Sequence, residues 1–332
     1  MCAAARSPSG EACSAAARQL RNGNTQQSIV NFVDACRGRI MGSSLKTLQR
    51  LMNLTRAGNL PPGGAICDIG ATQLFGGDLS SDGARDFLTF YASLTPKAKN
   101  PSELDEGFLA KIGHGGFLGD LLGAAGFEYT ALDIFHARNT ILFDLNVHAP
   151  GPRLYGKFDL VMNLGTTEHV FSQLRAFQSI HELTKPGGVV YHDLPFAGYF
   201  DHALFRYDPL FFREIVKANS YEILLQEITK GAEKPVPADV RSMGYPDDTV
   251  TDIGIEAILR RSSPEVFKVP MEISTSLSVD PGLSDVQQDD AVRMAPGFLV
   301  AYGAGAEGLP FRDLSALWLR RATAGVKRRI GL

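Results

Sequence analysis

Several features that mark specialised classes of protein are missing from this sequence. Its four cysteines, Cys2, Cys13, Cys36 and Cys67, contain no CxxC spacing, so neither a disulfide framework nor a zinc site is expected. No apolar run approaches the roughly 18 residues of a membrane span, which argues against integral membrane association. The formal net charge of −3 lacks the basic excess of a general nucleic-acid binder.

The first residues likewise lack the continuous apolar core of a secretory signal. Their alanine, serine and arginine content faintly resembles an organelle transit peptide, whereas their small polar character favours a disordered leader. Free thiols are typical of a reducing compartment, which predicts a cytoplasmic protein. The 332 residues of the chain, 44% of them hydrophobic and 21% charged, are enough for one large domain or two modest ones.

The chain divides into three regions by composition. Residues 1–60 are predicted to form a disordered leader and a helical cap, because leucines recur on one face of a helix over 44–55. Residues 61–275 alternate apolar strands with amphipathic helices, which predicts one α/β domain. Residues 276–332 are predicted as a C-terminal extension ending in a basic helix, whose apolar side faces either an anionic membrane or its own domain.

The stretch GAICDIGATQLFG, from Gly64 to Gly76, organises the predicted α/β domain. A short apolar run ends at Asp68, and Gly70 comes two residues later, which predicts a buried parallel strand and a tight turn. A glycine there lets a ligand approach the backbone, and the next N–H groups can hold an anion. Further strands are predicted at 127–133, 141–146, 158–163, 189–192, 221–228 and 253–259, with helices over 84–94, 117–125 and 172–183 and another from 209.

The ordered motifs resemble those of the class I S-adenosylmethionine-dependent methyltransferases. The matching pieces are DIG at 68–70, the acids Asp133 and Asp144, and then FDLVMN, EHV and LTKPGGVVYH, over roughly residues 61–261. The resemblance implies an α/β, Rossmann-like, seven-stranded, mostly parallel sheet with helices on both faces and an antiparallel last pair of strands. It also implies S-adenosylmethionine as cofactor and methyl transfer as the reaction.

The resemblance places the cofactor site at the strand ends. A carboxylate after the second strand would accept the ribose hydroxyls, and the acid after the third would lie at the adenine. Each of these acids can instead be an ordinary loop acid that caps the backbone. The predicted cofactor-binding residues are Asp68, Gly70, Thr72, Asp133, Asp144, Leu145, Asn163 and Gly165.

Two departures from the family pattern matter. The family usually has glycines at the next two alternate positions after D-x-G, where this chain has Thr72 and Leu74. Asp133 also follows Asp68 by 65 positions, against about 20 between turn and acid in a compact nucleotide-binding unit. The excess predicts an insert at 77–113, either a lid or a surface excursion. The composition of 230–250 predicts a second insert.

The catalytic candidates lie after the fourth and fifth strands. Glu168 and His169 follow the fourth, and His192, Asp193 and His202 belong to an aromatic-rich stretch after the fifth. A neutral histidine with a pKa of about 6.5 can accept a hydroxyl proton. His202 is therefore the predicted general base and His169 the runner-up, although either can be structural. One carboxylate and one imidazole do not make a cation site, so no metal is predicted.

The predicted function is O-methylation of a small-molecule or glycan acceptor, with no nucleic-acid partner. A nicotinamide-dependent oxidoreductase is disfavoured, because Thr72 breaks the G-x-G-x-x-G pattern that a pyrophosphate requires. A non-catalytic cofactor-binding or partner-binding module stays compatible with the altered loop. The acceptor atom and the oligomeric state are not defined by the sequence.

Overall fold

The computed structural model describes residues 44–74, 81–113, 116–244 and 248–272. The predicted leader, the start of the first insert at 77–80 and the C-terminal extension lie outside the described residues. Within the described part, no helix is both long and apolar enough to cross a membrane.

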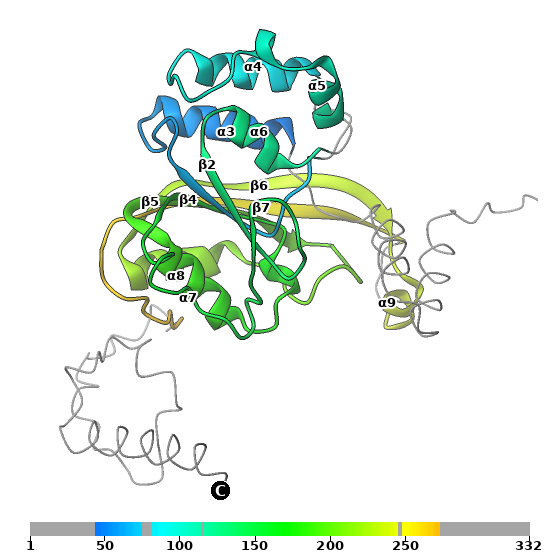
Figure 1. The fold of residues 1–332 in the computed structure, drawn as a ribbon. Coiled ribbons are helices and arrows are strands. Elements are labelled where there is room, and N and C mark those ends of the chain that lie inside the picture. The colour runs from blue at the N-terminus through cyan, green and yellow to red at the C-terminus, as the bar shows by residue number, and fades with distance from the viewer. Residues whose placement is uncertain (1–43, 75–80, 114–115, 245–247, 273–332) are drawn as a thin grey trace, which may run out of the picture.

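A seven-stranded sheet forms the centre of the fold (Figure 1). Its spatial order is β3-β2-β1-β4-β5-β7-β6; the first five strands are mutually parallel, and β7 runs antiparallel to both β5 and β6. The predicted fold class, including the antiparallel last pair, is confirmed. The strands are β1 (Ala65–Ile69), β2 (Glu128–Asp133), β3 (Thr140–Leu142), β4 (Phe158–Leu164), β5 (Thr184–Ala197), β6 (Tyr221–Pro235) and β7 (Thr249–Arg261).

Four helices cover one face of the sheet (Figure 1). The first, α3, begins directly after Ser44, whose side chain takes part in a capping box with Thr47. Leu48, Leu51 and Leu54 recur every third position on its inner face and are buried, as the sequence pattern predicts. The layer consists of α3 (Leu45–Arg56), α4 (Ser81–Ala92), α5 (Glu106–Gly113) and α6 (Leu118–Ala124), with a 3₁₀ turn at Pro101–Glu103.

The polar side of α3 forms ion pairs with Glu256 of β7. This fully buried carboxylate lies 2.6 Å from Lys46 Nζ and 2.9 Å from Arg50, and it accepts a hydrogen bond from the Tyr191 hydroxyl (2.6 Å). Burial raises the pKa of Glu256, but these hydrogen bonds and charges outweigh it and leave the pKa below its ordinary value. A buried charge is tolerated in a core when it is paired and hydrogen-bonded in this way, and these contacts connect α3 to β7.

The chain between β1 and α6 leaves the sheet and returns to the same place. Leu74 N donates to Gly116 O (2.7 Å), and Leu118 N donates to Thr72 O (3.0 Å). Helix α4 lies within this excursion, and its Phe87, Leu88 and Tyr91 are completely buried in the core. This packing makes α4 part of the helical layer in the described conformation.

Helices α7 (Gln173–Leu183) and α8 (Pro209–Asn219) cover the opposite face (Figure 1). Helix α8 begins as predicted: Asp208 accepts a hydrogen bond from Leu210 N (2.7 Å), and proline occupies the first turn. Helix α7 buries Ala176, Phe177 and Ile180 against the sheet.

The region 230–250 continues the sheet. β6 runs on to Pro235 and β7 starts at Thr249, with short helix α9 (Ala238–Ser242) between them. The sequence predicts shorter strands here, because proline, aspartate and glycine are rare in strands. Pairing between the two long strands overrides that preference.

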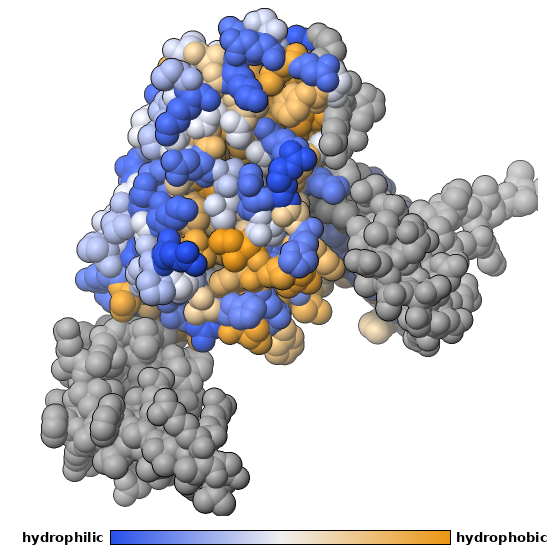
Figure 2. All heavy atoms as spheres, viewed as in Figure 1, coloured by the Kyte–Doolittle hydropathy of each residue, from blue (hydrophilic) through white to orange (hydrophobic). Residues whose placement is uncertain are grey.

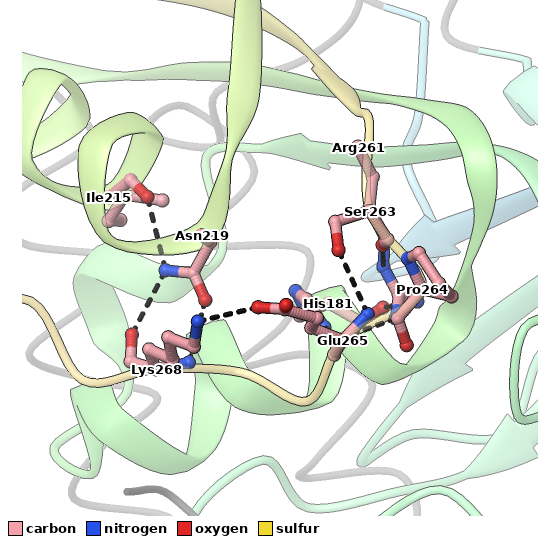
Figure 3. Close-up of polar contacts among 8 residues, drawn as sticks. All are labelled: His181, Ile215, Asn219, Arg261, Ser263, Pro264, Glu265 and Lys268. Atoms are coloured by element: carbon pink, nitrogen blue, oxygen red, sulfur yellow. Dashed lines mark hydrogen bonds and ion pairs between the residues drawn. The ribbon is translucent and has the colours of Figure 1, made fainter. Parts of the chain in front are cut away.

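The segment that follows β7 is held by hydrogen bonds to Arg261 and Asn219 (Figure 3). Arg261 is 2% exposed, and Asn219 exchanges hydrogen bonds with both the backbone N–H and C=O of Lys268. The Arg261 guanidinium donates to five carbonyl oxygens, those of His181 (2.9 Å), Thr184 (2.6 Å), Ser263 (3.0 Å), Pro264 (3.3 Å) and Glu265 (3.0 Å).

Candidate active site

The side chain of Asp68 stabilises the turn after β1 through hydrogen bonds. Its fully buried carboxylate accepts hydrogen bonds from Thr72 N (3.1 Å), Thr72 Oγ1 (3.0 Å) and the Tyr129 hydroxyl (2.8 Å). Burial raises the pKa of Asp68 to about 7, against the effect of these three bonds. Asp68 and Thr72 therefore hold the turn together, so in this conformation their side chains face each other and not a ligand.

Gly70 needs to be glycine in this turn for two reasons. Its φ of +95° lies in the left-handed region, and a Cβ would stand 2.6 Å from Thr166 Oγ1. That hydroxyl donates to Ile69 O (2.5 Å), so it ties the turn after β4 to the turn after β1. Leu74, where the family usually has glycine, is 1% exposed and packs in the core.

Asp133 ends β2 beside this turn. Its Oδ2 accepts a hydrogen bond from Ala71 N (2.8 Å) and its Oδ1 accepts one from Phe135 N (3.0 Å). The two backbone donors fix the orientation of a half-buried carboxylate next to Gly70. Each carboxylate oxygen keeps acceptor capacity for one more donor.

Asp144 and Leu145 lie after the short strand β3. Asp144 Oδ1 accepts hydrogen bonds from Asn146 N (2.8 Å) and Asn146 Nδ2 (3.0 Å), so the acid caps its own turn. Leu145 is 6% exposed and packs in the core.

Asn163 and Gly165 shape the turn after β4. Asn163 is fully buried; its Nδ2 donates to Thr167 Oγ1 (2.8 Å) and to His192 Nδ1 (3.0 Å), while its Oδ1 accepts from Thr167 N (3.2 Å). Gly165 has a φ of +79° and donates its N–H to Asp193 O (3.0 Å). Asn163 thus stabilises the turn through its hydrogen bonds to Thr167, and His192 points into the core.

His192 should make the protein's stability depend on pH. Burial lowers the pKa of His192 to about 3, whereas in the unfolded chain it is about 6.5. The unfolded state therefore binds an extra proton below pH 6.5, and stability from this residue is lost as the pH falls toward 3. His192→Gln abolishes that contribution, so the difference in unfolding free energy between wild type and variant should shrink by about 1.4 kcal/mol per pH unit from about 6.5 to 4.5. Urea titrations give this difference, and parallel curves would contradict the assignment.

Glu168 is the most unusual side chain of the site. It is completely buried, and neither carboxylate oxygen accepts a hydrogen bond from any described residue. His169 Nε2 lies 3.7 Å from Oε1. Burial raises the pKa of Glu168 to about 8, and the charge of Asp193 acts in the same direction. Buried polar atoms without partners are rare and indicate a functional role or a missing ligand.

The loop after β5 brings His202 to Glu168. Leu204 N and Phe205 N both donate to the Glu168 carbonyl oxygen (2.9 and 3.1 Å), and the His169 and His202 rings are 5.2 Å apart. Tyr199 and Asp201 adopt left-handed backbone angles in this loop, with φ of +48° and +53°. Such conformations cost of order 1–3 kcal/mol each and cluster at functional sites. One donor atom from each of Glu168, His169 and His202 lies within 4.8 Å of the others.

Large apolar side chains are exposed in the loops that follow three of the parallel strands. Phe171 is 79% exposed, Leu204 62%, Ile134 62% and Phe135 58%, in the loops that follow β4, β5 and β2. Figure 2 shows hydrophobic surface gathered across the lower half of the face drawn. Exposed large apolar groups at the carboxyl ends of parallel strands are typical of a ligand-binding region.

Two parts of the site are missed by sequence reasoning. Thr166, which joins the turns after β1 and β4, has no motif that would single it out. The Gly116–Phe117 segment lies against the β1 turn, because Gln73 and Phe117 form an antiparallel bridge. The glycines before α6 are the available signal, but by themselves they indicate only flexibility.

Comparison with known proteins gives one family match. Residues 112–226, from just before α6 into β6, match the family model of a methyltransferase domain. No curated protein matches the sequence. A Burkholderia thailandensis 1,6-didemethyltoxoflavin-N1-methyltransferase structure is 11% identical, covering 79% of this chain and 94% of that one, with a TM-score of 0.38. A putative sarcosine dimethylglycine methyltransferase from Galdieria sulphuraria is 14% identical, with 66% and 86% covered and a TM-score of 0.38.

The family match includes part of the motif set. It contains Asp133 at the end of β2, the turn at Gly165 and the EHV motif between β4 and β5, whereas the DIG turn at 68–70 lies outside it. The sheet of this chain has seven strands and an antiparallel last pair, as the resemblance implies. The chain therefore carries a methyltransferase domain, and its sheet has the strand order that the resemblance to the class I S-adenosylmethionine-dependent methyltransferases implies.

Proposed function

We propose that this methyltransferase transfers a methyl group from S-adenosylmethionine to a hydroxyl oxygen of a small-molecule or sugar-containing acceptor. The observation that supports this is the position of one turn, residues 165–169. Through Thr166 it contacts the glycine turn after β1, and through Glu168 it contacts the loop that carries His202. The cofactor turn and the group able to act on an acceptor are thereby adjacent.

The residues of the β1 and β2 ends fit the nucleoside part of the cofactor. Asp133 is oriented by two backbone N–H groups and retains acceptor capacity for two ribose hydroxyls. Gly70 keeps the neighbouring backbone free of a side chain. Thr72, by contrast, is bonded to Asp68, so its hydroxyl is not the proposed partner of the methionine carboxylate in this conformation.

The bound cofactor supplies a sulfonium methyl group, which is already a good electrophile. The chain then has to orient an acceptor, exclude water and remove a proton. Orientation of two reactants can contribute several kcal/mol. His202 and His169 are the residues proposed to act on the acceptor proton, and partial burial lowers the pKa of His169, which favours its neutral form. The exposed aromatic and aliphatic groups favour an acceptor with an apolar or sugar-ring face.

A screen with matched acceptors tests the acceptor atom. Hydroxylated aromatic compounds and sugars are compared with the corresponding amines and thiols, and release of S-adenosylhomocysteine is measured. We expect turnover with hydroxyl compounds only. Turnover confined to amines or thiols would contradict O-methylation and leave methyl transfer itself intact.

The Asp133 carboxylate should contribute to cofactor affinity. Asp133→Ala removes the acceptor of the ribose hydroxyls and should weaken S-adenosylmethionine binding by about 1–3 kcal/mol, roughly 5–150-fold, the scale for hydrogen bonds to a charged group. Asp133→Asn keeps one acceptor oxygen and should lose less. Calorimetry measures both, with Asp239→Ala on α9 as an exposed control. Equal affinity in all three variants would remove Asp133 from the site.

A further inference from the structure

Glu168 is the buried acid whose environment the proposed methyl transfer leaves unexplained, because its two carboxylate oxygens accept no hydrogen bond from the described residues. The loops bring two imidazoles to the same point, one from the next residue and one from the loop after β5. Sequence spacing alone supplies Glu168 and His169, which are too few for a site. The fold adds the third group, His202.

We infer that Glu168, His169 and His202 form a binding site for one divalent transition-metal ion, of the zinc and iron(II) class. Two imidazoles and one carboxylate are a ligand set that leaves coordination positions open for a substrate, whereas magnesium and calcium prefer oxygen ligands alone. The ligand set is therefore that of a catalytic ion, with room for an acceptor hydroxyl.

The geometry is close to what such an ion requires. Donor atoms bound to zinc at about 2.1 Å are separated by roughly 3–3.5 Å. His169 Nε2 and Glu168 Oε1 are 3.7 Å apart, and the three donor atoms lie within 4.8 Å of one another. The His169 side chain is 47% exposed, so its ring can rotate by the small amount needed. The backbone of Glu168 is held in place, because its carbonyl oxygen accepts hydrogen bonds from Leu204 N and Phe205 N.

The chemical consequence rests on the proposed function. A cation beside an acceptor hydroxyl lowers its pKa, as zinc does for bound water. With the ion bound, both imidazoles are ligands, and the ion replaces them in activating the acceptor hydroxyl. The hydroxyl proton is released to solvent, the oxygen forms a bond to the methyl carbon, and the sulfur–methyl bond breaks with its electron pair returning to sulfur. The overall change converts alcohol and sulfonium into methyl ether, thioether and a proton, so charge and atoms balance without a redox partner.

Metal binding can be tested without knowing the acceptor. The full-length chain is treated with chelator, dialysed, and titrated with Zn²⁺ by calorimetry and with Co²⁺ by visible absorption. We expect one ion per chain. Loss of an outer partner of a metal ligand typically costs about 10–100-fold in affinity, so Glu168→Gln and His202→Gln should each cost at least tenfold. The control His136→Gln, an exposed histidine, should bind as wild type does.

Each outcome either supports or overturns the metal site. No uptake of either ion by wild type, or equal affinity in all variants, would overturn it. If Glu168→Gln or His202→Gln fails to fold by circular dichroism, His169→Gln replaces it, because that side chain is half exposed. S-adenosylmethionine binding is measured on the same chelated samples. Metal binding without cofactor binding or turnover contradicts the proposed function and not the site, whereas chelator-resistant turnover without metal binding contradicts the site alone.

Discussion

Replacing Arg261 by methionine is expected to lower the free energy of unfolding by about 3–5 kcal/mol, the range for breaking a buried charged network. The guanidinium donates to five carbonyl oxygens, three of them in residues 263–265, and each of them loses this donor in the variant. Methionine fills the space of the arginine stem but donates no hydrogen bond. The substitution therefore separates the contribution of the hydrogen bonds to the free energy of unfolding from the contribution of side-chain packing.

Urea unfolding measures this effect. With a slope of roughly 1–3 kcal/mol per molar, the midpoint should fall by about 1 M or more. The matched control is Arg213→Met on α8, an exposed arginine whose substitution should change stability by no more than about 0.5 kcal/mol. Equal midpoints for the two variants would show that the Arg261 hydrogen bonds contribute nothing beyond solvation.

The second large effect concerns turnover. His202→Gln should reduce kcat by roughly 10²-fold or more, because glutamine can neither accept a proton at neutral pH nor replace an imidazole ligand effectively. Cofactor affinity should stay within about twofold, since His202 lies on the loop after β5 and not at Asp133 or Gly70. Single-turnover kinetics with an acceptor from the hydroxyl screen, together with calorimetry, separate the two quantities.

A catalytic role of His202 is distinguished from a structural one by comparing the change in kcat with the change in cofactor affinity. A structural role for His202 would lower stability and cofactor binding along with turnover, whereas a role at the acceptor lowers kcat alone. Asp239→Ala again serves as the remote control. Wild-type turnover in His202→Gln would remove the residue from the proposed chemistry.

The elements with strong periodicity are predictable from the sequence. Helix α3 lies within one residue of the predicted range 44–55, and β4 and α8 match their patterns closely. Helix α5 is not predicted, because its eight residues carry little amphipathic pattern within a polar, proline-containing stretch. β5 extends five residues past the predicted His192 end, since its partner β7 supplies hydrogen bonds that composition does not report.

The site is predictable only in part. A carboxylate at the end of β2 follows from strand order, so Asp133 can be placed beside the β1 turn. The roles of Asp68 and Thr72 cannot be predicted from the sequence. The same residues are compatible with a turn acid that faces a ligand and with one that hydrogen-bonds its own backbone. Proximity of His202 to Glu168 depends on two backbone hydrogen bonds from residues 204 and 205, which no side-chain motif encodes.

The outermost strand has a consequence for association between copies. β6 gives the sheet an edge of 15 residues, whereas β3 on the other side has only three. An unpaired edge exposes backbone groups that can pair with the edge of a second molecule, a common route to aggregation. Exposed charges of both signs, at Glu222, Glu227, Lys230 and Lys234, lie along β6, and Pro235 ends it. Burying these charges against another strand is unfavourable, so the longest strand of the fold is also the one protected by its sequence against edge-to-edge fibre growth.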